Sequence, residues 1–543
     1  MSRGFYSSDT LRFCAFETPL SIHVNPNRQA ALLVALLLFG TALRLYGLDE
    51  KIIWHDEVAT RVLSAGATLA AQMEGLYSTQ VLTAAQVLQF QQVQQASSVL
   101  ALLTDLAQHD PQHPPLYYVL AKGWVQLWGD SVFALRGLSV FFGVLSLPAL
   151  YWLMRELAAT RRAALLAVLL LCVSPLMILY SQEAREYALW ALTLLLSSAA
   201  LLRALRLSAA RSAWLLYVCC TLLAVYTSLS TASLILVQAA YVLAVTRLQW
   251  SNRLSGFFVS MCTVGLLFLP WVVNLLLNFE AFRASMAWSS VIVIPRTAVV
   301  RILSLNFSRN VFDFWPEVQQ DQWLPIAACM TCLLVIIASV AWVLTRTPRE
   351  TRLYLVLLLV LPTTLLLLPD LLFGGIRSTN ARYLMPVWLG LFAALALALD
   401  QGFARAGRAR VVAGLGLVCL VGLAMATNTL HAQQAAPWTK SLSISLPEVA
   451  RVMNQSERPL VVGNQERHHP GNLFALANLL KPETKMQFVP IALEASWILP
   501  VHQGAVYLYS PTEQFRRALE KNNQVTTKLV VEDLFLQLWR VED

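Results

Sequence analysis

The chain has 543 residues, of which 57% are hydrophobic and only 13% are charged, and its mean hydropathy is +0.58. A soluble protein is usually about 45–50% apolar and about 25% charged. This composition therefore excludes a soluble globular protein and indicates a polytopic membrane protein. The net charge of +9 comes largely from arginines in short loops between apolar runs. That placement is typical of cytoplasmic loops, so we expect no nucleic-acid partner.

The N-terminal segment 1–29 is polar and contains Arg3, Arg12 and Arg28, without the pattern of a cleavable signal peptide. We expect it to form a cytoplasmic tail. The apolar run 30–46 follows. Its length is close to the roughly 20 residues that span a bilayer, which predicts the first membrane helix.

A long polar segment, 47–132, is predicted to form the first outer loop. Apolar residues recur at helical spacing between 81 and 106, which predicts one or two helices on the membrane surface. The apolar segment 116–128 contains Lys122 and Gln126 and decides the topology. If it stays at the outer interface, the arginines that follow the next span are cytoplasmic, as the positive-inside rule favours.

The remaining apolar runs alternate across the membrane without conflict with this rule. They are predicted as spans at 133–154, 163–180, 187–202, 213–227, 232–246, 255–273, 324–345, 353–373, 381–399 and 411–427. The prediction is a transmembrane domain over 30–427 with about eleven helices, within a range of ten to thirteen. A further outer loop is expected at 274–322, and the C-terminus is expected outside.

The tail, 428–543, has a different character. Short apolar segments that read as strands are expected at 460–463, 505–509, 525–531 and 534–541, with helices at 472–480 and 512–521. Alternating short strands and helices are typical of a small α/β domain. We expect this domain to be extracytoplasmic.

Charged residues gather on the predicted outer face in four clusters: Asp56 with Glu57, His113, Glu183 with Arg185, and Arg377 with Arg382. A charge near the hydrocarbon is costly, so such residues tend to be paired or functional. Each cluster alone could also be an interfacial anchor with a snorkelling side chain. Clusters of both signs on one face favour a functional site.

The residue types suggest separate roles in a transfer reaction. A carboxylate beside an acceptor hydroxyl or amine can take its proton during attack, which makes Asp56 a candidate base. An arginine holds a phosphate better than a lysine does, which makes Arg382 a candidate phosphate clamp. Together they favour transfer from a phosphorylated lipid donor.

Five motifs in order resemble a known family. They are DE at 56–57, HPPLYY at 113–118, FALR at 133–136, SQEAREY at 181–187 and ARYLMP at 381–386. Their order and spacing resemble the bacterial branch of the dolichyl-phosphate-mannose:protein mannosyltransferases, which are GT-C glycosyltransferases related to the lipid A aminoarabinose transferase. The resemblance covers about residues 30–400.

This resemblance implies an inverting membrane transferase that moves a sugar from a polyprenyl-phosphate carrier to a lipid, glycan or protein acceptor. It implies Asp56 as the base and Glu57 as the neighbouring acid. The residues expected toward the donor phosphate and lipid are Arg382, Tyr383, Arg185 and Arg377, and those expected to line the cavity are His55, His113, Glu183 and Tyr117. The chain lacks the lumenal sugar-binding repeats of the protein-mannosylating members, which argues against a protein acceptor.

No cofactor is expected, and neither a DxD nor an HExxH pattern is present. The alternative is a divalent cation near Asp56, with His55, His109 and His113 as further candidate ligands. A second hypothesis is a transporter or flippase of lipid-linked sugars. Transporters commonly have two repeated halves with broken spans, and no such repeat is visible. A non-catalytic scaffold would leave the charged clusters without a role.

Overall fold

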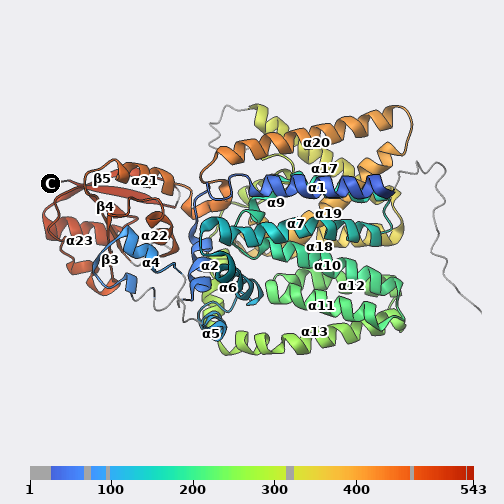
Figure 1. Ribbon diagram of the computed structural model, residues 1–543, viewed down its shortest axis with the longest axis horizontal. Coiled ribbons are helices and arrows are strands. Elements are labelled where there is room, and N and C mark those ends of the chain that lie inside the picture. Colours follow the sequence, from blue (N-terminus) through green and yellow to red (C-terminus); the bar gives the residue numbers. More distant parts are fainter. Residues whose placement is uncertain are drawn as a thin grey trace, which may run out of the picture.

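The computed structural model describes residues 26–66, 72, 75–92, 98–313, 323–464, 470–533 and 535–542. A bundle of long helices makes up most of the molecule, and a mixed α/β unit lies at one end of it (Figure 1). Most of the expected tail 1–29, and residues 314–322 of the expected loop 274–322, lie outside the described residues.

Eight helices among the described residues are long and apolar enough to cross a membrane. They are α1 (Pro26–Leu45), α7 (Val132–Glu156), α10 (Tyr187–Arg206), α13 (Asn252–Leu277), α17 (Trp323–Arg346), α18 (Arg349–Phe373), α19 (Met385–Phe403) and α20 (Arg408–Gln433). A bent pair, α8 (Arg161–Val173) with α9 (Pro175–Ser181), makes a ninth candidate. The chain is therefore an integral membrane protein.

Two shorter apolar helices, α11 (Arg211–Thr227) and α12 (Thr231–Thr246), occupy further predicted spans. The segment that decides the topology forms α6 (Leu116–Trp128), which is too short to pass as a candidate span and packs against α2 (His55–Ala65) and α7. Beyond α13, the described part of the expected loop is largely helical, with α14 (Phe279–Met286), α15 (Trp288–Val291) and α16 (Arg296–Ser308).

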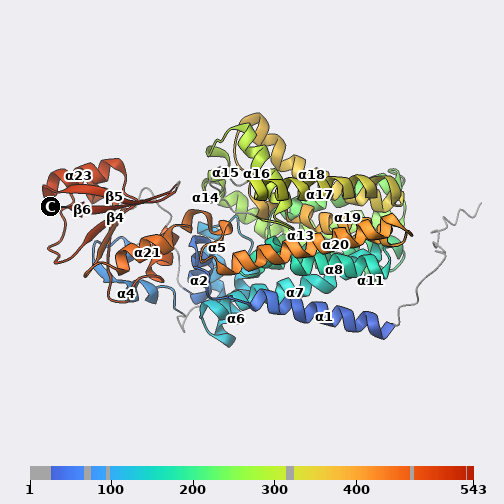
Figure 2. The same ribbon diagram turned by 90° about the horizontal axis from the view of Figure 1, so that it is seen from above.

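The α/β unit contains a six-stranded sheet in the order β1-β3-β2-β4-β6-β5. Its strands are β1 (Val81–Thr83), β2 (Leu460–Asn464), β3 (Lys485–Val489), β4 (Val506–Tyr509), β5 (Thr526–Glu532) and β6 (Gln537–Glu542). Strands β3, β2 and β4 are parallel, and β1 and β6 pair antiparallel at either side of them. Figure 2 shows the sheet from above.

Successive residues of β2 face opposite sides of the sheet, as a strand requires. Val461 packs with α21 (Leu446–Asn454) and α22 (Pro470–Ala477), whereas Leu460 and Val462 pack with α23 (Glu513–Asn523). The core on the Val461 side also includes Val58 and Val62 of α2. The α/β unit is thus packed directly onto the helix that begins at the candidate base.

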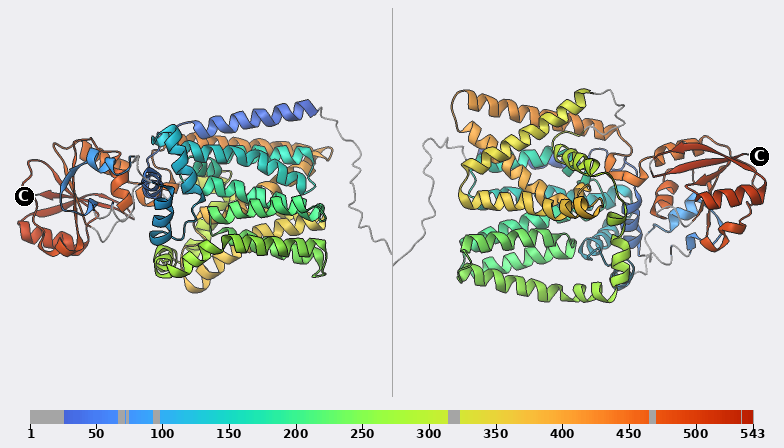
Figure 3. Two further views of the ribbon diagram at one scale, coloured as in Figure 1. Left: turned by 60° about the horizontal axis from the view of Figure 1, so that its bottom comes forward. Right: turned by 180° about the vertical axis from the view of Figure 1, so that it is seen from behind.

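Strand β1 corrects the prediction of surface helices over 81–106. Val81–Thr83 pairs with β3 of the C-terminal sheet, and helices begin only afterwards, at α4 (Ala84–Gln89) and α5 (Val99–His109). Thr83 ends the strand and caps α4, because its side chain accepts from Gln86 N and its own N–H is bonded by the Gln86 side chain. The sheet therefore ties the first loop to the C-terminal tail (Figure 3).

The bent span is held by a buried arginine. Pro175 has no N–H to donate, so the carbonyl of Leu171 loses its helical partner, and α9 continues at 62° to α8. Arg44 of α1 donates to the carbonyls of Leu171 and Cys172 and to Ser181 Oγ. The guanidinium thus replaces the hydrogen bonds that the proline removes.

A second buried cluster centres on Glu57, which has no exposed surface. Its carboxylate accepts two hydrogen bonds from Arg136 of α7 at 2.8 Å, one from Lys440 Nζ at 2.9 Å and one from Ala184 N at 2.8 Å. Lys440 belongs to the 3-10 helix η2 (Trp438–Ser443). Glu57 therefore joins α2, α7, the turn after α9 and η2.

Replacing Arg44 by Met is expected to destabilise the bundle, because the carbonyls of Leu171 and Cys172 would stay buried without partners. Each such group costs about 1–3 kcal/mol. The measurement is the midpoint of thermal unfolding in detergent, with Arg161→Met, at an exposed position of α8, as the matched control. Equal midpoints for the two variants would contradict this role of Arg44.

Replacing Glu57 by Gln is expected to cost about 3–5 kcal/mol, since it leaves two buried cations without their carboxylate. Burial alone would raise the pKa of Glu57, but Arg136 and Lys440 outweigh it and lower the pKa to about 2 from an ordinary 4.5. A depressed pKa means that this stabilisation is complete above about pH 4.5 and is lost as the pH falls toward 2.

Unfolding midpoints measured between pH 7 and pH 3 check this expectation. The difference between wild type and Glu57→Gln should narrow as the pH falls below 4.5, whereas the exposed control Glu50→Gln should follow wild type. A difference that does not depend on pH would contradict the role given to the Glu57 carboxylate.

Candidate active site

Asp56 and Arg382 face each other at the end of the bundle that carries the α/β unit. Arg382 Nη1 lies 2.8 Å from Asp56 Oδ2 and donates to the Tyr187 hydroxyl at 2.9 Å. Their side chains are 21% and 17% exposed, so water and a ligand can reach both. Asp56 is in the first turn of α2, where the helix dipole favours a negative charge.

Aromatic rings surround the Arg382 guanidinium. It lies 5.4–6.0 Å from the ring centres of Trp54, Tyr187, Trp288 and Tyr383, within the range of cation–π attraction. Its Nε atom has no hydrogen-bond partner among the described residues. The arginine is therefore held in place by aromatic rings, while part of its side chain stays exposed.

Arg185 is more completely engaged. Its Nη2 donates to His113 Nε2 at 2.9 Å, its Nε lies 3.2 Å from Glu186 Oε2, and its Nη1 donates to the backbone carbonyl of Asp56 at 3.3 Å. His113 in turn contacts Asp110 at 2.7 Å through Nδ1. Arg185 and His113 therefore hold the backbone at Asp56, and little of Arg185 is left for a donor phosphate.

His55 connects Asp56 to the C-terminal tail. Its Nε2 lies 3.3 Å from Asp56 Oδ1, its Nδ1 lies 3.4 Å from Ser443 Oγ, and Ser443 donates to Asn472 Oδ1 at 2.6 Å. Because the single hydroxyl proton of Ser443 is used on Asn472, His55 Nδ1 must donate to Ser443. When Nε2 is also protonated, both ring nitrogens act as donors: Nδ1 to Ser443 and Nε2 to Asp56.

Several residues predicted for the site lie elsewhere. Glu57, expected as a catalytic acid, is fully buried in the cluster described above. Glu183 is also buried, 3.5 Å from Lys440 Nζ, and burial together with Glu57 raises its pKa. Arg377 pairs with Asp370 at 2.9 Å. Tyr117 is buried and bonds Ser139.

Other contributors were not predicted as site residues. Arg136 lies in the FALR motif but was given no role, and Lys440, Ser443 and Asn472 come from the tail. Trp54 lies just before the DE motif and Tyr187 ends the SQEAREY motif, so their position was a usable signal for the aromatic residues around Arg382. No local pattern marks the tail residues, because they meet His55 and Glu57 across about 380 residues of chain.

The described residues were compared with the ligand groups that hold metal ions. No group of three or more His, Cys, Asp or Glu side chains gathers closely enough to hold an ion within these ranges. Next to Asp56 the positive charge is supplied by Arg382. The side chains around Asp56 therefore suit an anionic ligand better than a divalent cation.

Known proteins were compared with the chain. Residues 112–274 match the family model described as dolichyl-phosphate-mannose-protein mannosyltransferase. No curated protein matches the sequence. Among solved structures, ArnT from Cupriavidus metallidurans bound to undecaprenyl phosphate is similar with a TM-score of 0.55 at 14% identity, covering 95% of this chain and 98% of that one.

The apo state of the same ArnT gives a TM-score of 0.51 at 15% identity, with the same coverage. The Archaeoglobus fulgidus oligosaccharyltransferase tethered with an acceptor peptide gives 0.50 at 12% identity, over 86% of this chain and 64% of that one. At such identities a structural likeness shows the fold. The resemblance found in the sequence is confirmed: residues 112–274 match the mannosyltransferase family model, and the chain shares the membrane fold of ArnT.

Proposed function

We propose that the protein is a membrane glycosyltransferase that moves a sugar from a polyprenyl-phosphate carrier to an acceptor, with inversion at the anomeric carbon. The partly exposed pairing of Asp56 with Arg382, beside a group of aromatic rings, carries this proposal. It places a candidate base and a candidate anion-binding group side by side. The family model and the shared fold support the reaction class.

In the proposed reaction the acceptor hydroxyl or amine attacks the anomeric carbon from the side opposite the lipid phosphate. The bond from that carbon to the phosphate oxygen breaks, and its electron pair leaves with the phosphate. The acceptor proton passes to the Asp56 carboxylate. Arg382 offsets the charge on the departing phosphate, an electrostatic effect that can contribute several kcal/mol.

The geometry of the pair suggests the order of these events. Arg382 Nη1 lies 2.8 Å from Asp56 Oδ2 and offsets its charge. A donor phosphate would compete with Asp56 for the guanidinium. As the guanidinium turns toward the phosphate, the carboxylate loses a cationic partner and becomes a stronger base. Donor binding would thus prepare Asp56 for the acceptor, and the proposal requires no metal ion.

The membrane arrangement belongs to the same proposal. We infer eleven crossings, from the eight long helices, the bent pair α8–α9, and the short helices α11 and α12. Arginines at the ends of α7, α10 and α17 then lie on one side, which the positive-inside rule makes cytoplasmic. The α/β unit over 428–543 and Asp56 lie on the extracytoplasmic side of the cell inner membrane.

A transporter or flippase is less well supported. Its spans are commonly broken near the substrate, and α8–α9 is a broken span. However, the carbonyls freed at that break are bound by Arg44. They are not available to an ion or a substrate.

Asp56→Asn is expected to lower the transfer rate about 100- to 10,000-fold, the usual contribution of a general base. The measurement is transfer from a polyprenyl-phosphate sugar by purified protein in the presence of envelope extract as acceptor source. Asp49→Asn, an exposed carboxylate of the same loop, is the control and should retain activity. Transfer by Asp56→Asn at near the control rate would exclude Asp56 as the base.

Arg382→Gln is expected to weaken donor binding about 10- to 100-fold, because a charge-assisted hydrogen bond contributes about 1.5–3 kcal/mol. Donor affinity can be measured by titrating the purified variant with polyprenyl-phosphate sugar in detergent. The control is Arg283→Gln, which makes the same change of charge at an exposed position of α14, away from the site. If both variants bind the donor like wild type, Arg382 is not the phosphate clamp.

A further inference from the structure

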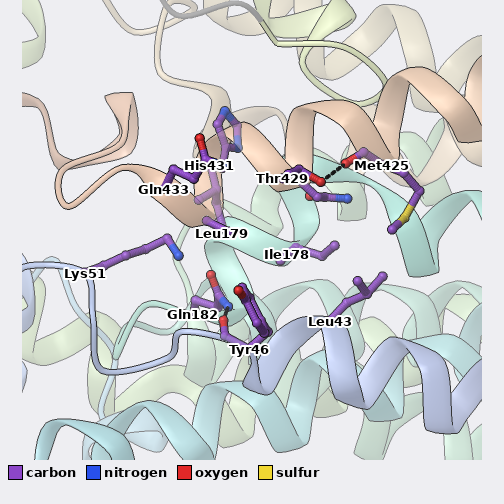
Figure 4. Close-up of a pocket in the computed structure, with 12 residues that line it drawn as sticks. Leu43, Tyr46, Lys51, Ile178, Leu179, Gln182, Met425, Thr429, His431 and Gln433 are labelled. Atoms are coloured by element: carbon purple, nitrogen blue, oxygen red, sulfur yellow. Dashed lines mark hydrogen bonds between the residues drawn. The ribbon is translucent and has the colours of Figure 1, made fainter.

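A cavity of about 260 Å³ opens beside α1, α9 and α20 (Figure 4), and Asp56 is not among its lining residues. Apolar side chains of the three helices line one part of it, including Leu43, Ile178 and Met425. Polar groups line the rest, among them Gln182, His431 and the ammonium of Lys51. One water occupies about 30 Å³, so the space suits a phosphate group with several carbons attached.

Lys51 is the charged group of this cavity. It follows α1 in the loop before α2, and only 5% of its surface is exposed. Among the described residues it makes no ion pair through its ammonium. Burial and the charges of Lys440 and Arg136 lower the pKa of Lys51 to about 8. Glu50 opposes this shift only in part. A bound anion would therefore stabilise the buried Lys51 cation.

The hydrogen bonds of the other polar lining groups are partly committed. Gln182 Nε2 donates to the carbonyls of Arg44 and Tyr46, and Thr429 donates to Met425. His431 Nε2 lies 2.9 Å from Asp313, while His431 Nδ1 has no partner among the described residues. Lys51 is thus the group in this cavity with an unused positive charge.

The cavity also borders the membrane face of the bundle. Both α1 and α20 pack on the bent span, and their outward sides carry exposed apolar residues. Leu38 and Val418 are 68% and 69% exposed, and Leu45 and Leu430 near the cavity are 39% and 46% exposed. A lipid's hydrocarbon chain lying between these two helices would contact their apolar side chains. Its headgroup would then reach the Lys51 cation in the cavity.

This cavity is separate from the candidate active site. The lining residues do not include Asp56, Arg382 or any aromatic residue around Arg382. The Glu57 cluster is linked to the start of this cavity, because Arg136 bonds both the Glu57 carboxylate and the backbone carbonyl of Lys51. A ligand in the cavity would contact neither Asp56 nor Arg382.

We propose that this cavity binds the phosphate headgroup of an anionic lipid, with the phosphate on Lys51 and the hydrocarbon chain between α1 and α20. The site is additional to the donor site and does not depend on sugar transfer. The apolar floor and the membrane-facing position favour a lipid over free phosphate, which would gain nothing from the apolar part.

The test is native mass spectrometry of the full-length protein in detergent with dioleoyl phosphatidic acid as the probe. Lys51→Gln removes the cation and keeps the backbone carbonyl that Arg136 uses. Ala432→Phe fills the cavity from α20 without changing charge. Each variant is expected to bind the probe at least about tenfold more weakly, which corresponds to about 1.4 kcal/mol. Lys481→Gln, an exposed lysine of the α/β unit, should bind like wild type.

Two further measurements distinguish this lipid site from the donor site and from a site for free phosphate. The loss caused by Lys51→Gln should persist in an Arg382→Gln background, and inorganic phosphate at equal concentration should not displace the lipid. Unchanged binding by both Lys51→Gln and Ala432→Phe would overturn the proposal. It would also be overturned if the Lys51 effect vanished without Arg382, or if inorganic phosphate competed as well as the lipid.

Discussion

The buried carboxylate of Glu57 is the contact on which the arrangement of the site depends. It has no exposed surface, and it accepts hydrogen bonds from α7, from η2 and from the turn after α9. A buried ion pair does not by itself guarantee stability, because desolvation offsets much of the attraction. The Glu57 cluster instead determines how the segments are arranged. Four segments that are distant in sequence meet at this carboxylate, and the donors that face it are all satisfied.

This constraint fixes Asp56 as well. Neighbouring residues of an α-helix point about 100° apart, so when Glu57 faces the interior, Asp56 is turned toward the partly open side where Arg382 lies. Arg185 and His55 then hold Asp56 from two directions, through its backbone carbonyl and its carboxylate. The α/β unit takes part in this support, because Ser443 and Asn472 hold the ring of His55. The tail is therefore part of the site's framework.

The sequence predicted the positions of the long helices, because apolar runs of membrane length are strong signals. It also selected Asp56, after the first span, and Arg382, before a late one, as site residues, and the structure brings these two side chains together. The roles given to them remain predictions. Glu57 was predicted as the acid beside the base. Adjacency in sequence suggests a shared function, whereas helix geometry turns the two acids apart, and Glu57 lies buried among Arg136 and Lys440. Strand β1, with three residues, was missed because so short a segment has no periodicity. Lys440 and Asn472 could not be found, because their partners lie hundreds of residues away.

In the proposed reaction, Asp56 and Arg382 act together to break a sugar–phosphate bond and transfer the sugar with inversion. The most direct measurement follows a polyprenyl-phosphate sugar of known anomeric configuration in reconstituted vesicles that contain acceptor material from the envelope. Mass spectrometry then detects the products, and NMR assigns the anomeric configuration of the new bond. Free polyprenyl phosphate and a product of opposite configuration are expected. Recovery of the lipid-linked sugar intact on the far side of the membrane, or a product with retained configuration, would contradict it.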